Sequence, residues 1–107
     1  MALRATKRVE QVIDNETLEA MVVQDPIRPG LERGRLADYE ISVWAIIAHF
    51  QGLNEGPVGK TVDPAVIARV AADYHVPERA VHAALAYYRQ HRVIIDNFLA
   101  RNAAAVS

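Results

Sequence analysis

Most of the chain alternates apolar and polar residues with the period of an amphipathic helix. The clearest helix begins after Ser42, a residue type that caps helix N-termini, and is predicted to end at Gly52. Its apolar stripe keeps the i, i+3, i+4, i+7 spacing and consists of Val43, Ile46, Ile47 and Phe50. The segment 53–62 that follows contains glycine and proline without a periodic pattern, and it is predicted to be a loop.

Two further helices follow this loop, with a short turn between them. Asp63 and Pro64 supply an N-cap and a proline at the first helical position. The apolar face of this helix is Ile67, Val70, Ala71 and Tyr74. Because Pro77 disfavours helix at the residue before it and suits a new helix start, His75 and Val76 are predicted to form a tight turn. The inward positions of the next helix are Val81, Ala84, Leu85 and Tyr88. The pattern then continues weakly, as a prolongation or a separate terminal helix, through Ile94, Ile95, Phe98 and Leu99.

A different pattern precedes these helices. A short helix is predicted over residues 4–13, and Leu18–Gln24, rich in apolar and β-branched residues, is predicted to be a strand. Two prolines and a glycine in Asp25–Gly30 indicate a turn, and the alternation over Arg35–Ile41 indicates a second strand. Together these segments predict a small antiparallel hairpin with an edge available for pairing with another chain.

The two helices on either side of Val76 have the arrangement of a DNA-binding helix-turn-helix unit. Such a unit needs a small residue where the second helix crosses the first, an apolar residue in the turn, and apolar residues that pack back from the second helix. Ala71 supplies the small residue and Val76 the apolar turn residue. His75 stands where glycine is common because the backbone φ is positive. The sequence therefore predicts a mainly α fold, a helix-turn-helix bundle preceded by a small N-terminal β-hairpin.

The second helix of this unit carries the candidate DNA-binding residues. Its outward stripe is Arg79, His82, Ala86, Arg89 and Gln90, and the small residues Ala83 and Ala86 are expected to let the backbone approach a groove. Arg79 is the candidate for a base edge, because arginine pairs bidentately with guanine. Arg89 and Arg92 are expected to meet phosphates. The alternative interpretation is an ordinary solvated face, or one that docks a protein partner.

Length and charge limit the possible functions. A chain of 107 residues forms one domain, and 12 Lys and Arg against 13 Asp and Glu argue against a uniformly basic coat for nucleic acid. From Pro77 onward, however, arginines outnumber acidic residues, so the C-terminal third is the basic one. The lack of cysteine excludes disulfides, cysteine-based metal sites and thiol catalysis. No apolar run approaches the ~20 residues of a membrane span, and a cytoplasmic location is expected.

The motifs that resemble catalytic or cofactor sites are incomplete. Gly59-Lys60-Thr61 looks like the end of a phosphate-binding loop but lacks the preceding glycine, since Asn54 stands there, and the helix that should follow directly. The four histidines do not have metal-ligand spacing. Asp73 and Asp96 have neither a paired carboxylate nor a nucleophile at a useful spacing. We therefore expect no enzyme activity, no metal and no cofactor.

From about Gly34 to Asn102 the chain resembles the domain-of-unknown-function 433 family. The resemblance rests on Gly34-Arg35-Leu36, Ile41 to Ile46, Ile67-Ala68, Ala72-Asp73-Tyr74, and above all Val81 to Tyr88 followed by His91 and Ile95-Asp96. It implies a homeodomain-like helix-turn-helix and the role of a VapB-like antitoxin, whose partner is a PIN-like ribonuclease toxin. The loop from Gly52 to Val62 is longer than is usual in the family, and the first thirty residues match it poorly.

The favoured hypothesis is thus an antitoxin-like DNA-binding regulator that also inhibits a PIN-like ribonuclease. Residues 34–107 form the helix-turn-helix domain with its C-terminal helix, and residues 1–33 form an N-terminal segment for dimerisation or partner binding. Charge suggests that the acidic cleft of the toxin is met by Arg28, Arg33, Arg35 or Arg101. A homodimer is expected, because helix-turn-helix proteins read paired half-sites. The competing hypothesis is a protein-interaction or oligomerisation module that has this fold and does not bind DNA.

Overall fold

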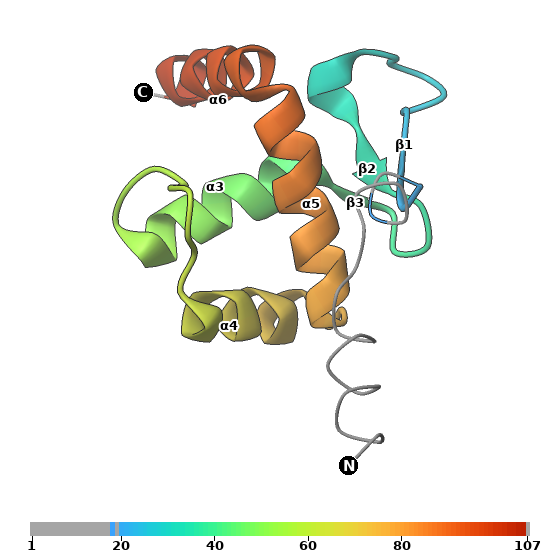
Figure 1. Cartoon of the computed structure of the whole chain (residues 1–107). Helices are drawn as coiled ribbons and strands as arrows, with labels where there is room; N and C mark the ends of the chain where they lie inside the picture. The colour runs from blue at the N-terminus through green and yellow to red at the C-terminus, as the bar shows by residue number, and fades with distance from the viewer. Residues whose placement is uncertain (1–17, 19, 107) are drawn as a thin grey trace.

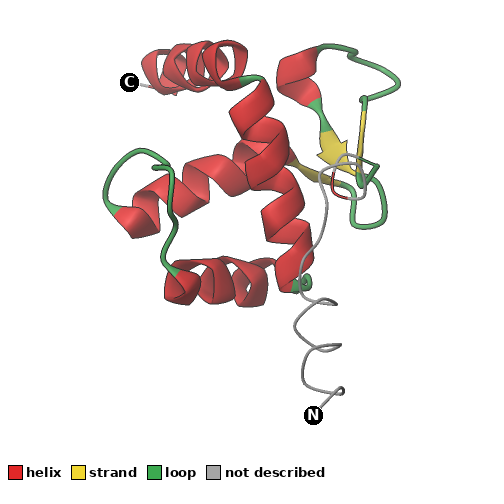
Figure 2. Ribbon diagram, in the orientation of Figure 1, coloured by secondary structure: helices red, strands yellow, loops and turns green. Residues whose placement is uncertain are grey.

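The computed structural model describes residue 18 and residues 20–106, with side chains through residue 102. In this part of the chain four helices and a small three-stranded antiparallel sheet are present (Figures 1 and 2). The mainly helical class predicted from the sequence is therefore confirmed. The helix predicted over residues 4–13 lies outside the described residues.

Helix α3 (Val43–Asn54) begins at the predicted position but ends later. Ser42 is its N-cap, although its side chain makes no capping hydrogen bond. The four apolar residues of the predicted stripe are all buried, which confirms the inward face. The predicted end at Gly52 is wrong, because the helix continues to Asn54 and closes on Glu55 in the left-handed conformation, with φ 58°. The N–H of Gly56 then donates to the carbonyl of Gln51, which satisfies the last turn.

Helix α4 (Pro64–Tyr74) starts as the sequence predicts. The Asp63 carboxylate accepts a hydrogen bond from the N–H of Ala65 at 2.9 Å, and Pro64 occupies the first turn, where no intrahelical donor is needed. Ile67, Val70 and Ala71 are buried. The predicted cap and the predicted inward face are both confirmed.

Three residues connect α4 to α5 (Glu78–Gln90). His75 adopts the left-handed conformation with φ 59°, and the N–H of Val76 donates to the carbonyl of Ala71 at 3.0 Å. Val76 is nearly buried, and Pro77 is the N-cap of α5. The predicted turn is therefore confirmed, with histidine at the position that usually favours glycine.

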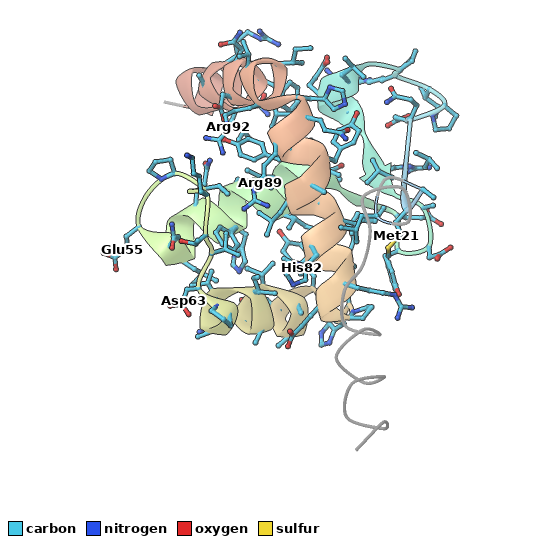
Figure 3. All side chains as sticks on the ribbon, viewed as in Figure 1. Met21, Glu55, Asp63, His82, Arg89 and Arg92 are labelled. Carbon is cyan, nitrogen blue, oxygen red and sulfur yellow. The ribbon has the colours of Figure 1, made fainter. Side chains whose placement is uncertain are left out.

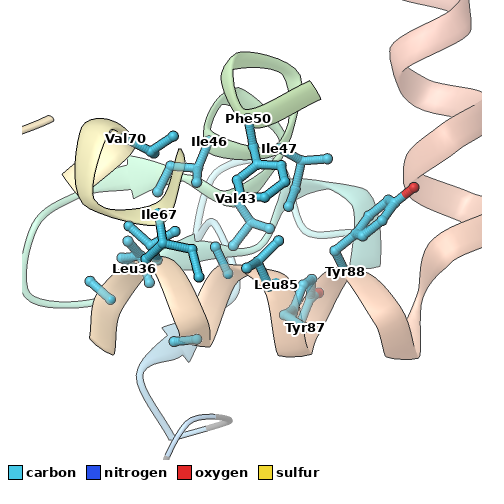
Figure 4. Close-up of a cluster of buried hydrophobic side chains, with 14 of the residues drawn as sticks. Leu36, Val43, Ile46, Ile47, Phe50, Ile67, Val70, Leu85, Tyr87 and Tyr88 are labelled. Carbon is cyan, nitrogen blue, oxygen red and sulfur yellow. The ribbon is translucent and has the colours of Figure 1, made fainter. Parts of the chain in front are cut away.

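Helix α5 is the centre of the core, where α3, α4 and strand β2 (Arg35–Leu36) pack against it (Figures 1 and 4). The inward residues predicted for it, Val81, Ala84, Leu85 and Tyr88, are all buried. Ala83 is also fully buried, so its predicted place at a DNA groove is wrong. The alanines of α5 instead let its neighbours pack closely around it. The largest fully buried side chains of the core are Tyr88, Phe50, Leu36, Ile46, Ile47 and Leu85.

The sheet contains three two-residue strands in the order β1–β2–β3, all antiparallel. Strand β1 (Val22–Val23) pairs with β2, and β2 pairs with β3 (Ile41–Ser42). The predicted pairing of the first segment with the second is thus correct, but both strands are shorter than predicted. The prediction of one strand over Arg35–Ile41 is wrong, because the chain folds back between β2 and β3. Glu40 has a φ of 54°, and its N–H donates to the carbonyl of Leu36. A one-turn 3-10 helix, η1 (Leu31–Arg33), precedes β2.

Helix α6 (Arg92–Val106) is a separate terminal helix, which decides between the two alternatives left by the sequence. The chain changes direction at His91, where φ is −126° and ψ is 35°. Ile95 and Phe98 face the rest of the protein and are buried, whereas Val93 is 72% exposed. This first turn of α6 therefore presents apolar surface to the solvent.

Candidate functional site

The outer face of α5 carries the residues predicted to meet DNA. Arg79, His82, Arg89 and Gln90 are exposed, and Ala86 between them is half-buried. Arg79 lies in the first turn of α5 and makes no hydrogen bond or ion pair with any described residue. Its guanidinium is therefore free to meet a ligand from the N-terminal end of the helix.

Arg89 and Arg92 hold the loop between α3 and α4. The Nη2 group of Arg89 donates to the carbonyl of Gly59 at 3.2 Å, and that of Arg92 donates to the carbonyl of Val58 at 2.9 Å. Arg92 also lies over the Tyr88 ring, with its guanidinium carbon 4.8 Å from the ring centroid. Figure 3 shows both arginine side chains on the side of α5 that faces this loop. Phosphate contact by Arg89 and Arg92 stays a prediction. It requires the guanidinium N–H groups that are not bonded to the loop carbonyls.

Leu18 lies beside the outer face of α5. It is 7% exposed and lines a shallow pocket of about 270 Å³ together with His82, Ala86, Arg89 and Gln90. Leu18 therefore borders the predicted DNA-binding stripe. The sequence places Leu18 at the start of a predicted strand, and that pattern does not indicate which surface the leucine covers.

Three of the four predicted partner-binding arginines meet in one place. Arg28, Arg33 and Arg35 line an open concavity of about 500 Å³, which we call the arginine cavity. The other residues that line it are Asp25, Pro26, Ile27, Ser42 and Trp44. Arg101 is exposed on α6 and does not line this cavity. The structure thus brings together residues from the turn after β1, from η1, from β2 and from the start of α3.

The turn that carries Arg28 is fixed by its own polar side chains. The Asp25 carboxylate accepts hydrogen bonds from the N–H groups of Ile27 at 2.8 Å and Arg28 at 3.1 Å, and these bonds lower the pKa of Asp25. The side-chain amide oxygen Oε1 of Gln24 accepts from the N–H of Gly30 at 2.9 Å, which closes the turn. The charges of Arg35 and Arg28 also lower the pKa of Asp25, but one carboxylate does not balance the three guanidinium groups that line the cavity.

Tyr87 of α5 connects this turn to the helical core. Its hydroxyl donates to the carbonyl of Leu31 at 2.6 Å and accepts from Nε2 of Gln24 at 3.2 Å. Its ring packs directly against Gly34, and burial raises its pKa. The segment that bears the arginines is thus attached to the helix proposed to read DNA.

Aromatic residues surround the same region. The Trp44 and Phe98 rings meet edge to face with their centroids 5.6 Å apart, and the Arg33 guanidinium lies 5.2 Å from the Phe98 centroid. These contacts connect the cavity to α6. They also orient Arg33, whose only other polar contact with a described residue is a long one to Glu32, at 3.8 Å.

A second polar cluster joins α3 to α4. The His49 Nε2 lies 2.7 Å from a carboxylate oxygen of Asp73, and Arg69 donates from Nε to the same carboxylate at 3.1 Å. The hydrogen bond with His49 and the contacts of Arg69 lower the pKa of Asp73. The i, i+4 spacing of Arg69 and Asp73 is a signal in the sequence for their pairing. The contact of His49 with Asp73 has no such signal, because it depends on how α3 packs on α4. This cluster links α3 to α4 at the protein surface.

The buried Tyr88 carries the largest perturbation of a titratable group among the described residues. Its hydroxyl donates to the Asp96 carboxylate at 2.6 Å and also lies 3.5 Å from Nε2 of Gln51. Burial and then the bond to Asp96 raise the pKa of Tyr88 to about 12. The hydroxyl therefore joins α5 to α6 in its protonated form.

We expect the Tyr88 hydroxyl to make the protein sensitive to alkali. Because the folded-state pKa of about 12 lies above the unfolded value, the folded protein holds this proton more tightly. The resulting stabilisation is fully present below about pH 10 and is lost as the pH rises through the folded pKa. Absorbance titration of the phenolates should show a last transition near pH 12 that Tyr88→Phe removes. Completion of all tyrosine ionisation by pH 10.5 in the folded protein would contradict this assignment.

Comparisons of the chain with protein-family models, curated proteins and solved structures find no match. None of the described helices is long and apolar enough to cross a membrane. In the same part of the chain, no group of three or more His, Cys, Asp or Glu residues is placed to hold a metal ion.

Proposed function

We propose that the protein is a DNA-binding regulator of the helix-turn-helix, homeodomain-like type with an antitoxin-like role. The observation that carries this proposal is the geometry of α4, its three-residue turn and α5. The left-handed His75 and the nearly buried Val76 direct α5 across α4, and the start of α5 leaves Arg79 and His82 exposed. In proteins of this type the second helix enters the major groove with its N-terminal residues at the base edges.

Each residue of the outer face has a distinct role in this proposal. Arg79 meets a base edge, because two N–H donors of its planar guanidinium suit the paired acceptors of guanine. It lies in the first turn of α5, and its side chain is unpaired with described residues. His82 and Gln90 lie further along the same face and contact the groove wall. Arg89 and Arg92 meet the phosphates with the donors that the loop carbonyls leave free. Two copies of the chain bind two half-sites, since one short helix reads only a few base pairs.

Replacing Arg79 with alanine is expected to relax sequence preference, and replacing Arg89 is expected to weaken binding to every sequence alike. Loss of one bidentate base contact reduces discrimination by about 1–3 kcal/mol, which is roughly 5- to 150-fold. The measurement is fluorescence anisotropy with the DNA upstream of the coding sequence and with a scrambled fragment, each at two salt concentrations. Specific binding should weaken steeply with salt, because counterions are released when phosphates are neutralised.

Arg101→Ala is the matched control, because Arg101 is an exposed arginine on α6, away from the outer face of α5. It should leave both affinity and discrimination unchanged. Absence of binding to either fragment at low salt would overturn the proposal, and the protein would then be an interaction or oligomerisation module with this fold.

The antitoxin-like role adds a PIN-like ribonuclease as the second partner, and Arg101 fits it better than the other candidates. A guanidinium that blocks an acidic metal-binding cleft has to protrude from the surface that carries it. Arg101 is exposed on a terminal helix, whereas Arg28, Arg33 and Arg35 line a concavity. Co-purification with a ribonuclease encoded beside this chain, weakened by Arg101→Ala, tests this part of the proposal separately from DNA binding.

A further inference from the structure

The arginine cavity concentrates more positive than negative charge. Arg28, Arg33 and Arg35 line it, and Asp25 is the single acidic residue among the lining side chains. The Asp25 carboxylate already accepts two backbone hydrogen bonds within its own turn. Three guanidinium groups around one concavity repel one another, and an anion placed between them removes that repulsion.

The donors of these arginines are largely unused. The side chains of Arg28 and Arg35 make no hydrogen bond or ion pair with any described residue. The Arg33 guanidinium has only the 3.8 Å contact with Glu32 and its position over the Phe98 ring. Arg89 and Arg92 provide a contrast within the same molecule, since each donates to a loop carbonyl. The arginines of the cavity therefore have N–H groups free for a carboxylate or a phosphate, which planar guanidinium groups bind in pairs.

The remaining lining residues add a hydroxyl and a flat apolar surface. Ser42 caps α3, but its side chain makes no capping hydrogen bond, so its hydroxyl remains available for a ligand. Trp44 is half-buried, held edge to face by Phe98, and Ile27 is 85% exposed. A volume of about 500 Å³ lies within the range of about 300–1,000 Å³ that small-molecule sites occupy.

We propose that the arginine cavity binds a small organic anion with a planar ring. The carboxylate or phosphate of the ligand lies among the guanidinium groups of Arg28, Arg33 and Arg35 and accepts a hydrogen bond from Ser42. The ring lies against Trp44 and Ile27. This site does not depend on the proposed DNA binding. It is connected to α5 through Tyr87, whose hydroxyl bonds to Leu31 and Gln24 at either end of the turn.

Trp44 is the only tryptophan of the chain, so its fluorescence reports directly on the cavity. The full-length protein, without DNA, is titrated separately with adenosine 5′-monophosphate, benzoate, inorganic phosphate and uncharged adenosine. Excitation near 295 nm follows Trp44, and isothermal calorimetry gives an independent affinity. We expect saturable binding of at least one of the two ringed anions. That probe should bind at least tenfold more tightly than adenosine and than inorganic phosphate. The preference between monophosphate and benzoate distinguishes a phosphate ligand from a carboxylate ligand.

The variants Arg28→Ala and Arg35→Ala should each weaken binding of the preferred probe about tenfold or more, which corresponds to the loss of a charge-assisted hydrogen bond. Lys60→Ala is the control, because it removes an exposed positive charge that does not line the cavity, and it should bind as the unmodified protein does. The Arg28 side chain is exposed and makes no hydrogen bond with the described residues, and alanine keeps the N–H that donates to Asp25, so Arg28→Ala is expected to fold normally. Failure of both ringed anions to bind saturably, or unchanged affinity in Arg28→Ala, would overturn the proposal. Neither result depends on whether the protein binds DNA.

Discussion

Leu36→Ala is expected to lower the free energy of unfolding by about 3 kcal/mol, within the range measured when a buried leucine is truncated and a cavity remains. Leu36 is fully buried in β2 and packs between the sheet and the helices (Figure 4). A domain of this size has a total stability of about 5–15 kcal/mol, so one truncation removes a large part of it. Urea denaturation followed by far-ultraviolet circular dichroism measures the change.

Leu31→Ala provides the matched control, because it makes the same chemical change at a leucine that is 42% exposed. It should cost less than about 1 kcal/mol, as truncations at the surface do. A similarly small loss of unfolding free energy in Leu36→Ala would mean that the sheet does not unfold cooperatively with the helical core. The helical signal itself is the readout, so a large effect shows that β2 and the helices unfold together.

Gly34→Ala is expected to destabilise the protein by about 1–3 kcal/mol, the usual cost of forcing extra atoms into a packed site. A Cβ at Gly34 would lie 2.7 Å from the Tyr87 ring and 2.9 Å from its hydroxyl. The backbone of Gly34 has φ −62° and ψ 149°, which alanine adopts freely, so the cost is steric. The ring cannot simply move aside, because its hydroxyl is bonded to Leu31 and Gln24.

The control makes the same substitution at another glycine, Gly52→Ala in α3, where an added Cβ has no neighbour within 4 Å. Alanine is favoured over glycine inside a helix by about 0.5–1 kcal/mol, so this variant should be more stable. The two substitutions are chemically identical and opposite in sign. Tyr87→Leu removes the ring atoms that clash, and the cost of Gly34→Ala should shrink in that background. An equal cost in both backgrounds would contradict the steric explanation.

Much of the helical architecture follows from the sequence, because apolar periodicity and caps are local properties. The start of α4 at Asp63 and Pro64 and the turn before Pro77 were both predicted correctly. The end of α3 was not, since the left-handed residue is Glu55 and the glycine that normally signals such a position comes one residue later. The fold back before Ile41 was missed for a similar reason: Glu40 adopts a positive φ that its residue type does not indicate.

The sequence predicts which residues belong to the candidate sites, but not how the fold groups them in space. The outward stripe of α5 follows from helical spacing, and its exposure is confirmed for Arg79 and His82. The grouping of Arg28, Arg33 and Arg35 around Trp44 depends on the pairing of β2 with its neighbours and on the attachment of the turn to Tyr87. The contacts of Arg89 and Arg92 with loop carbonyls cannot be predicted from a charge pattern, because the acceptors are backbone atoms some thirty positions away.

The attachment of the N-terminal segment to Tyr87 also orders the events of folding. Helices α3, α4 and α5 follow one another along the chain, so their mutual contacts close only short stretches of chain. Gln24 meets Tyr87 across 63 positions, and closing so long a loop costs more conformational entropy. We therefore expect the three helices to pack first and the strand segment that contains Gln24 to dock on them last. A nascent chain, which emerges with that segment first, has to keep it unpaired until α5 has been synthesised.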